Sequence, residues 1–384
     1  MNEREILQKI TDEFYWFHRH PELSYEEVET TKRLRDDLAA ADIEVLDLPL
    51  NTGLVAKVGT GEAPFIALRC DIDGLPIQEE SGLDYASEHA GRMHACGHDF
   101  HISTVLGSAY LLKAQEKELH GTVYLIFQPA EEAPGGARKV METGVLKKVQ
   151  AIFGLHTSPL YDVGTLGIRA GAVTASVDKF TVTFCGKGTH AAHPERGTDP
   201  IVMAASFVTA AQSIVSRNID PAHPSLVSIT HIESGNTWNV IPESAWLEGT
   251  VRCLTAEDRK RIKQRIYELA EGQAASFGGH AELTWYAGPP ATNNTPDWTD
   301  FAIQVAEASG LTVEPAPVNL AGEDFAYYQE KIPGAMVLLG VRNEATKSVY
   351  PQHHGKYTVD ESVLIKGAAL HVQTALDYLG VKLD

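Results

Sequence analysis

From about Phe65 onward, apolar runs of strand length alternate with segments that carry a helical spacing of apolar residues. The runs FIALR, VYLIFQ and AIFGL are separated by helix-like segments at 102–117 and 137–142. This alternation is typical of an α/β fold built on a mainly parallel sheet. Because ligands of such sheets bind beyond the carboxyl ends of the strands, the polar residues that follow each run are candidate site residues.

The pattern changes between residues 178 and 289. Strands are predicted there at 179–188, 226–232, 245–253 and 281–287, and helices at 200–217 and 257–277. Their order is the β-α-β-β-α-β order of a small ferredoxin-like α+β sandwich. A turn-rich segment follows at 288–296, after which helix and strand patterns resume. We therefore expect a discontinuous catalytic domain at 1–177 and 290–384, interrupted by an inserted domain at 178–289.

Charge and targeting signals restrict the possible partners. The formal net charge of −19 is spread along the chain, so we expect no binding to nucleic acid or to an anionic membrane. Residues 1–10 lack the basic start and apolar stretch of a signal peptide, and no run reaches the roughly 18 apolar residues of a membrane span. The four cysteines are scattered without a C-x-x-C pair, which indicates reduced thiols and a cytoplasmic protein.

The segment HACGHDFH places Cys96 and His98 two residues apart, around Gly97. This spacing brings both side chains to one side of an extended segment or loop, but to nearly opposite sides of a helix. A thiolate and an imidazole both bind borderline cations such as Zn²⁺. A lone Cys-x-His pair often occurs by accident, so a metal site needs further ligands.

Further ligand candidates follow the later strands. Glu131 and Glu132 come after VYLIFQ, where adjacent side chains diverge, so that one can bind a metal while the other faces a reactant. His156 follows AIFGL, and His353 and His354 lie in the turn-like PQHHG. Each of these alone is more often a solvated or structural residue than a ligand. Together with the Cys-x-His pair they supply five ligands, which suits two metal ions: Cys96, His98, Glu132, His156 and one of His353 and His354.

The remaining carboxylate suggests the chemistry. Metal ions lower the pKa of bound water and polarise an amide carbonyl, and Glu131 is placed to take the proton of the water and hand it to the departing amine. His190, in the glycine-containing segment GKGTHAAHPERG, is a candidate donor to the oxyanion, with an idle loop histidine as the equal alternative. Asp73 is expected to orient a ligand histidine, whereas Asp71 fits that role and an ordinary salt bridge equally well.

Ten segments identify a resemblance that runs nearly end to end. They are, in order, HPELSYEE, RCDIDGLPI, HACGHDFH, FQPAEEAPGGA, GLHTSP, GKGTHAAHP, GNTWNVIP, EGTVR, GEDFAYY and HHGKYTVDE. With these segments the chain resembles the bacterial N-acyl-amino-acid amidohydrolases, which are relatives of hippurate hydrolase, N-acetylcysteine deacetylase and the plant auxin-conjugate hydrolases. Ten ordered motifs are specific, whereas any one of them is weak.

The resemblance implies a ligand set and an assembly. It implies that the di-metal centre is bound by Cys96, His98, Glu132, His156 and His353, with Glu131 as base and Asp73 as the orienting aspartate. The first histidine of the family's turn is the ligand, which favours His353, although Gly355 and Gln352 depart from the usual proline and apolar residue. The inserted domain is expected to form a homodimer in which His190 completes the site of the partner. Asn239 is similar to a residue that binds substrate or oxyanion, and Arg252 fits either a substrate carboxylate or a salt bridge.

The activity implied is metal-dependent hydrolysis of the amide bond of small N-acyl L-amino acids, above all N-acetyl ones, with release of a carboxylate and the free amino acid. Two divalent ions per subunit are expected, and the ligands suit Zn, Mn, Co or Ni. N-acetyldiaminopimelate and hippurate or auxin conjugates are alternative substrates. A cysteine amidase with Cys96 as nucleophile is a different class, but it leaves Glu132 and the ligand histidines without a role. A third class is a binding protein that keeps the fold but has lost catalysis. Such a protein would not need the base and every ligand position, and all of these positions are filled here.

Overall fold

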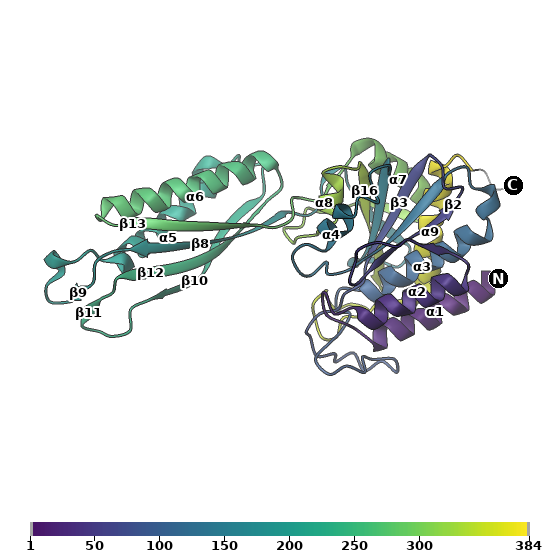
Figure 1. Cartoon of the computed structure of the whole chain (residues 1–384), viewed down its shortest axis with the longest axis horizontal. Coiled ribbons are helices and arrows are strands. Elements are labelled where there is room, and N and C mark those ends of the chain that lie inside the picture. Colours follow the sequence, from purple (N-terminus) through teal and green to yellow (C-terminus); the bar gives the residue numbers. More distant parts are fainter. Residues whose placement is uncertain (1–2, 382–384) are drawn as a thin grey trace. The chain divides into compact units, whose positions relative to one another are not determined.

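The computed structural model describes residues 3–381 and divides the chain into two compact units. The first comprises the chain up to Gly171, Asn293–Pro317 and the chain from Tyr327 onward, and the second comprises Ala172–Thr292 and Val318–Ala326. Each unit has its own hydrophobic core. Figure 1 labels their helices and strands.

The first unit is built on an eight-stranded sheet with the order β1-β2-β4-β3-β5-β16-β6-β15. Its strands are β1 (Glu44–Val45), β2 (Leu54–Gly59), β3 (Phe65–Asp71), β4 (Thr122–Gln128), β5 (Ala151–Asp162), β6 (Thr165–Ile168), β15 (Thr312–Pro315) and β16 (Gly334–Arg342). The central strands β4, β3, β5 and β16 are mutually parallel, whereas β2 is antiparallel to β4 and β6 is antiparallel to β16. The predicted mainly parallel sheet is confirmed.

Helices cover this sheet. They are α1 (Glu3–Arg19), α2 (Val28–Ala40), α3 (His98–Ala114), α4 (Gly136–Glu142), α7 (Pro296–Ala308), α8 (Ala326–Gln329) and α9 (Leu364–Tyr378). Nearly every residue of α3 is buried, because it packs on β3 and also contacts α1 and α9. Among residues 3–381, no helix is both long and apolar enough to cross a membrane.

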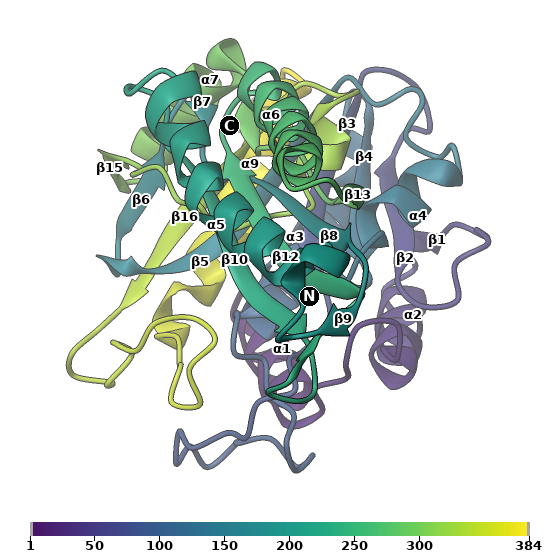
Figure 2. The same cartoon turned by 90° about the vertical axis from the view of Figure 1, so that its left-hand side faces the viewer.

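The second unit has the ferredoxin-like order predicted from the sequence. Its main elements are β8 (Ser176–Cys185), α5 (Pro200–Asn218), β10 (Ser225–Ser234), β12 (Ser244–Cys253), α6 (Ala256–Ser276) and β13 (His280–Ala287). The four strands form an antiparallel sheet in the order β10-β12-β8-β13, and α5 and α6 pack on one face of it (Figure 2). Two short strands, β9 (Thr189–His190) and β11 (Val240–Ile241), pair beside this sheet.

Alternating burial along β8 shows how the sequence determines the two faces of this sheet. Phe180, Val182 and Phe184 are fully buried and belong to the core beneath the helices. Their neighbours in the chain are only partly buried, since successive residues of a strand point to opposite faces. The face without helices therefore carries polar side chains, among them Lys179 and Cys185.

Candidate metal centre

The ends of two neighbouring parallel strands supply four carboxylates. β3 ends at Asp71, and Asp73 follows in the loop; Glu131 and Glu132 follow the end of β4. The two strands pair in parallel over their whole length, so their carboxyl ends meet at one edge of the sheet. This is the arrangement that the alternation of strands and helices predicts.

His156 reaches the same region from inside a strand. The sequence predicted it just after a strand, but β5 continues from Ala151 to Asp162, so this detail of the prediction was wrong. β3 pairs with β5 only as far as Gly154, and His156 therefore lies beyond the point where β3 leaves its neighbour. A long strand with a shorter neighbour can place an interior residue at the edge of the site.

Cys96 and His98 lie on a turn that enters a helix. Cys96 is in the turn, Gly97 precedes the helix with a φ of 83°, and His98 is the first residue of α3. A Cβ on Gly97 would lie 2.5 Å from Thr157 Oγ1, so both the backbone angle and the close approach require glycine. The predicted loop form of the Cys-x-His pair is thus observed, and α3 begins at His98 instead of near Ile102.

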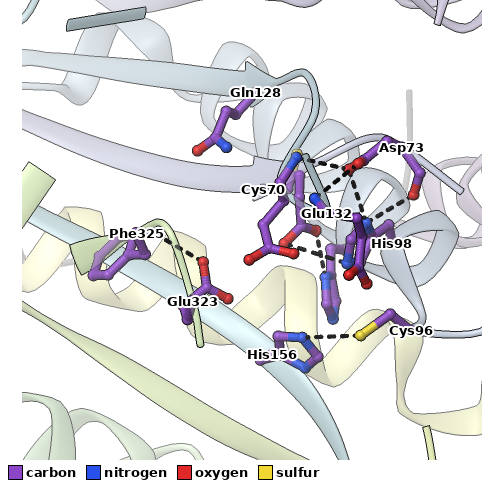
Figure 3. Close-up of polar contacts among 12 residues, drawn as sticks. Cys70, Asp73, Cys96, His98, Gln128, Glu132, His156, Glu323 and Phe325 are labelled. Atoms are coloured by element: carbon purple, nitrogen blue, oxygen red, sulfur yellow. Dashed lines mark hydrogen bonds and ion pairs between the residues drawn. The ribbon is translucent and has the colours of Figure 1, made fainter. Parts of the chain in front are cut away.

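Asp73 connects the histidine to the carboxylate loop (Figure 3). Its Oδ1 accepts the Glu131 backbone N–H at 3.1 Å, and its Oδ2 accepts the Glu132 backbone N–H at 3.0 Å and the Ser24 hydroxyl at 2.6 Å. His98 Nδ1 lies 2.8 Å from the Asp73 carbonyl oxygen and 3.2 Å from Oδ1. Burial opposes ionisation, but these partners outweigh it and lower the pKa of Asp73 below its ordinary value.

The candidate donor atoms form linked clusters. Donor atoms of Cys96, Glu132 and His353 lie within 4.8 Å of one another, and so do donor atoms of His98, Glu131 and Glu132, so Glu132 belongs to both groups. Cys96 Sγ lies 3.6 Å from His156 Nε2 (Figure 3), and Glu132 Oε1 lies 3.1 Å from His353 Nε2. The structure therefore brings all five predicted ligands and Glu131 together.

The buried Nε2 of His98 has no hydrogen-bond partner within the described part of the chain. His98 Nε2 is fully buried, and the closest carboxylate oxygen recorded for it, Asp71 Oδ2, lies 3.7 Å away, beyond hydrogen-bonding distance. Leaving a buried polar atom unpaired costs free energy, and such an atom in a folded protein indicates a ligand or a catalytic role.

The electrostatics of Cys96 favour the form of the side chain that binds metals. Burial raises the pKa of the thiol, but the charge of His156 and its hydrogen bond with the thiol, together with the neighbouring His353 and His98, outweigh burial and lower the pKa to about 6. Hydrogen bonds with Cys96 and Glu132 raise the pKa of His353 to about 10. Cys96 is therefore a thiolate near neutral pH, the ionisation state that coordinates metal ions.

The structure distinguishes the two adjacent histidines. His353 has a positive φ of 61° and its backbone N–H donates to the Ala95 carbonyl at 2.8 Å, which holds its ring beside Glu132. The ring of His354 instead stacks on Tyr350. Only His353 joins the cluster.

Gln352 has a contact that the sequence did not reveal. Its side-chain amide donates to the Thr157 carbonyl at 3.0 Å and lies 3.2 Å from His156 Nδ1. The sequence showed only that Gln352 replaces a usual apolar residue. The structure places the Gln352 side chain in contact with His156, a candidate ligand.

A second network beneath the site was also not predicted. His101 Nδ1 donates to Asp71 Oδ1 at 2.6 Å, and its Nε2 accepts the Thr157 backbone N–H at 2.9 Å, so both ring nitrogens are used. Burial lowers the pKa of His101 to about 3, so the ring is neutral. Asp71 also pairs with the buried Arg69 at 2.8 Å, so the salt bridge expected as one alternative for Asp71 is present beside its contact with His101. The spacing of His98 and His101, one helical turn apart, was the available signal.

His18 supports the first turn of α3. Its Nδ1 lies 2.5 Å from Asp99 Oδ2, and its Nε2 lies 3.1 Å from Glu79 Oε1. Burial lowers the pKa of this ring, but the two carboxylates outweigh that effect and raise the pKa to about 9. The charged ring therefore ties α1 to the residue that follows His98.

This pair predicts a pH-dependent stability. Because the pKa of His18 is raised in the folded state, its contribution is complete below about 6.5, the ordinary value, and is lost as the pH rises through about 9. At about 1.4 kcal/mol per pH unit, the free energy of unfolding of the first unit should fall by up to about 3 kcal/mol across this range. Urea titrations at several pH values test this. In His18→Gln the decline should be smaller by about this amount, and an unchanged decline in that variant would exclude His18 as a source.

Three predicted site residues lie in the second unit. His190 is exposed on β9 and faces Val240 on β11, and the Asn239 carbonyl accepts the Ala191 N–H at 3.0 Å, so the antiparallel pairing of β9 and β11 brings the segments of His190 and Asn239 side by side. A hollow of about 780 Å³ is lined in part by His190 and Trp246. Arg252 lies on β12, where its guanidinium donates to the Thr250 hydroxyl and to the Val251 carbonyl.

The chain is similar to a known protein family over most of its length. Residues 67–377 match the model of peptidase family M20/M25/M40. A Bacillus subtilis protein named N-acetylcysteine deacetylase is 45% identical over 361 residues, which cover 94% of each chain. The Arabidopsis thaliana IAA-amino acid hydrolase ILR1-like 2 is 41% identical over 95% of this chain and 84% of its own. The crystal structure of the Bacillus subtilis YXEP protein, described as a dinuclear metal binding peptidase from the M20 family, covers 99% of this chain and 100% of its own at a TM-score of 0.88 and 40% identity.

Proposed function

The chain belongs to peptidase family M20/M25/M40, and on this premise we propose that it hydrolyses the amide bond of small N-acyl L-amino acids, above all N-acetyl ones. The observation that carries the proposal is the pair of donor groups that share Glu132, with the carboxylate of Glu131 beside them. The similarity to proteins named N-acetylcysteine deacetylase and IAA-amino acid hydrolase supports an amide bond as the bond that is cleaved.

We propose that the cluster holds two divalent cations, chosen among Zn, Mn, Co and Ni. A thiolate, imidazoles and a carboxylate are the donors that these ions prefer, and the unpartnered Nε2 of the buried His98 fits a ligand role. The proposed ligands are Cys96, His98, Glu132, His156 and His353. When bound, such ions activate water and polarise the substrate carbonyl.

Within this site the chain's own residues have separate tasks. Glu131 accepts a proton from the attacking water at its carboxylate and returns it to the departing amine nitrogen. Asp73 keeps His98 and the Glu131–Glu132 backbone in place through its hydrogen bonds. For His190 and Asn239 we propose contacts to the oxyanion or the substrate, and for Arg252 a contact to the substrate carboxylate.

The experiment is release of free amine from N-acetyl, N-benzoyl and indoleacetyl amino acids, measured before and after removal of metal by a chelator. We expect turnover of N-acetyl substrates, its loss on chelation and its return with added metal. If only substrates with aromatic acyl groups were turned over, the protein would be a hippurate- or auxin-conjugate-type hydrolase instead of a deacetylase. Full activity without metal would contradict the metal mechanism.

A cysteine amidase remains the second candidate, because the lowered pKa of Cys96 and the neighbouring His156 are also what a nucleophilic cysteine requires. Rapid-quench mass spectrometry separates the two mechanisms. An acyl adduct on Cys96 belongs only to the amidase, and its absence during turnover supports the metal-dependent route.

We further propose that residues 178–289 act as an inserted dimerisation domain, that His190 completes the site of a second copy, and that the protein is cytoplasmic, where Cys96 stays reduced. Large apolar side chains of the second unit are exposed without cover: Ile201, Val202, Ile232, Trp238 and Val240. Trp238 is 91% exposed, and β10 is an edge strand of its sheet. Aromatic anchors and open strand edges are features of protein interfaces.

Replacing the exposed tryptophan is expected to weaken this dimer. Trp238→Ser should raise the dissociation constant by roughly 30-fold, equivalent to about 2 kcal/mol for an interface hot spot. Sedimentation over a range of protein concentrations measures the change. Tyr286→Ser is the matched control, since Tyr286 is 52% exposed on the opposite edge strand, β13. A monomeric wild type, or equal effects of the two substitutions, would contradict the proposed interface.

A further inference from the structure

A second group of metal-binding side chains lies in the ferredoxin-like unit, on the face of the sheet that α5 and α6 do not cover. Cys185 is the last residue of β8 and is directly opposite His280, the first residue of β13. Directly opposed residues of antiparallel strands point to the same face, with Cβ atoms about 4.5–5.5 Å apart. Glu282 lies two residues further along β13 and therefore points to that face as well.

The three donors are already close to one another. One donor atom each of Cys185, His280 and Glu282 lies within 4.8 Å of the other two. Zinc binds sulfur at about 2.3 Å and nitrogen or oxygen at about 2.0–2.2 Å, so its ligand atoms are about 3–4 Å apart. The His280 and Glu282 side chains are exposed, so no packing opposes the small rotations that this spacing requires.

The charges around the group favour a cation. Within the described part of the chain, neither His280 nor Glu282 takes part in an ion pair or a side-chain hydrogen bond, so no protein cation occupies the carboxylate. The pair His231 and Glu248 on the same face differs in this respect, because Lys179 Nζ lies 2.7 Å from Glu248 and no cysteine is nearby. Neutralisation of Glu248 by lysine leaves that pair unsuited to a metal ion.

We propose that Cys185, His280 and Glu282 form a zinc-binding site that is separate from the candidate metal centre. The thiolate and imidazole select Zn²⁺ over the harder Mg²⁺ and Ca²⁺, and solvent fills the remaining coordination position. The site joins the end of β8 to β13 directly before Gly186–Thr189, the segment that leads to His190. Bound zinc therefore restrains the start of the segment that carries His190.

The test is the zinc content of the full-length protein after equilibrium dialysis at controlled free zinc, with the catalytic residues intact. We expect wild type to bind one zinc ion more per chain than Cys185→Ala, His280→Gln or Glu282→Gln. Loss of one ligand should weaken zinc at this site by more than the roughly 10- to 100-fold that loss of an outer partner costs. The His280 and Glu282 substitutions are at exposed positions, so a folding defect of the cysteine variant does not prevent the test.

His231→Gln, on the same face but outside the group, is the matched control and should keep the full zinc content. A second readout is trypsin cleavage after the exposed Lys187, which zinc should slow in wild type and not in Glu282→Gln. Equal zinc content in wild type and the three variants, or an equal loss in the control, overturns the proposal. Because the readout is a difference between chains with the same catalytic residues, failure of the proposed hydrolase function leaves it unaffected.

Discussion

Glu131→Gln should lower kcat for N-acetyl amino acids by about 10²- to 10⁴-fold, the usual contribution of a positioned general base. The amide keeps the size of the side chain, and the Glu131 backbone N–H still donates to Asp73. Glu132 and the other proposed ligands remain, so metal content and KM should change little. The amide cannot accept the proton of the attacking water, so the loss should fall on the chemical step. Steady-state kinetics and elemental analysis of the same preparation measure both effects.

Two further variants distinguish a general base from a metal ligand at position 131. Glu132→Gln should lose metal as well as activity, because Glu132 belongs to both donor groups. Glu118→Gln, at an exposed carboxylate of the first unit, should retain both. Loss of metal from the Glu131 variant would make Glu131 a ligand instead of a base. Retention of most activity would remove it from the mechanism.

The fold could be predicted because its signals are local. The strands and helices of the second unit lie within a few residues of the predicted ranges, since alternating and helical spacings are visible in short windows of sequence. The position of His156 was wrong for the opposite reason. Where β5 passes beyond the end of β3 depends on the length of a neighbouring strand, and no window around His156 contains that information.

The residues of the site also fall into those that the sequence reveals and those that only the structure reveals. Cys96, His98, Glu131 and Glu132 were predictable because their residue types and spacing suit metal chemistry. The residues that hold them were not, because each acts through a contact with a distant part of the chain. Ser24 reaches Asp73 across 49 positions. Gln352 reaches the Thr157 carbonyl across 195 positions. A hydroxyl or an amide has too many structural uses for its type alone to reveal such a partner.

Asp73→Asn should have the second large effect, because one carboxylate there supports three parts of the site. It accepts the backbone N–H groups of Glu131 and Glu132 and the hydroxyl of Ser24, and it lies beside His98 Nδ1. Asparagine keeps one accepting oxygen but has an NH2 group, which donates and cannot accept, in place of the other, so at least one of these donors loses its partner. We expect metal affinity to fall by about 10- to 100-fold, as for other residues that orient a ligand histidine.

The activity of this variant should therefore depend on how much metal is supplied. At limiting metal it should be lost, whereas at saturating metal it should return in part, because Glu131 and the proposed ligands are still present. Titration of the metal-depleted variant with Mn²⁺ or Zn²⁺ while turnover is followed gives the activation constant directly. Ser24→Ala removes only one donor to the same carboxylate and should shift that constant less. If the two variants gave the same constant as wild type, Asp73 would contribute to packing and not to metal binding, and the orientation of His98 would have to come from the Asp73 backbone carbonyl alone.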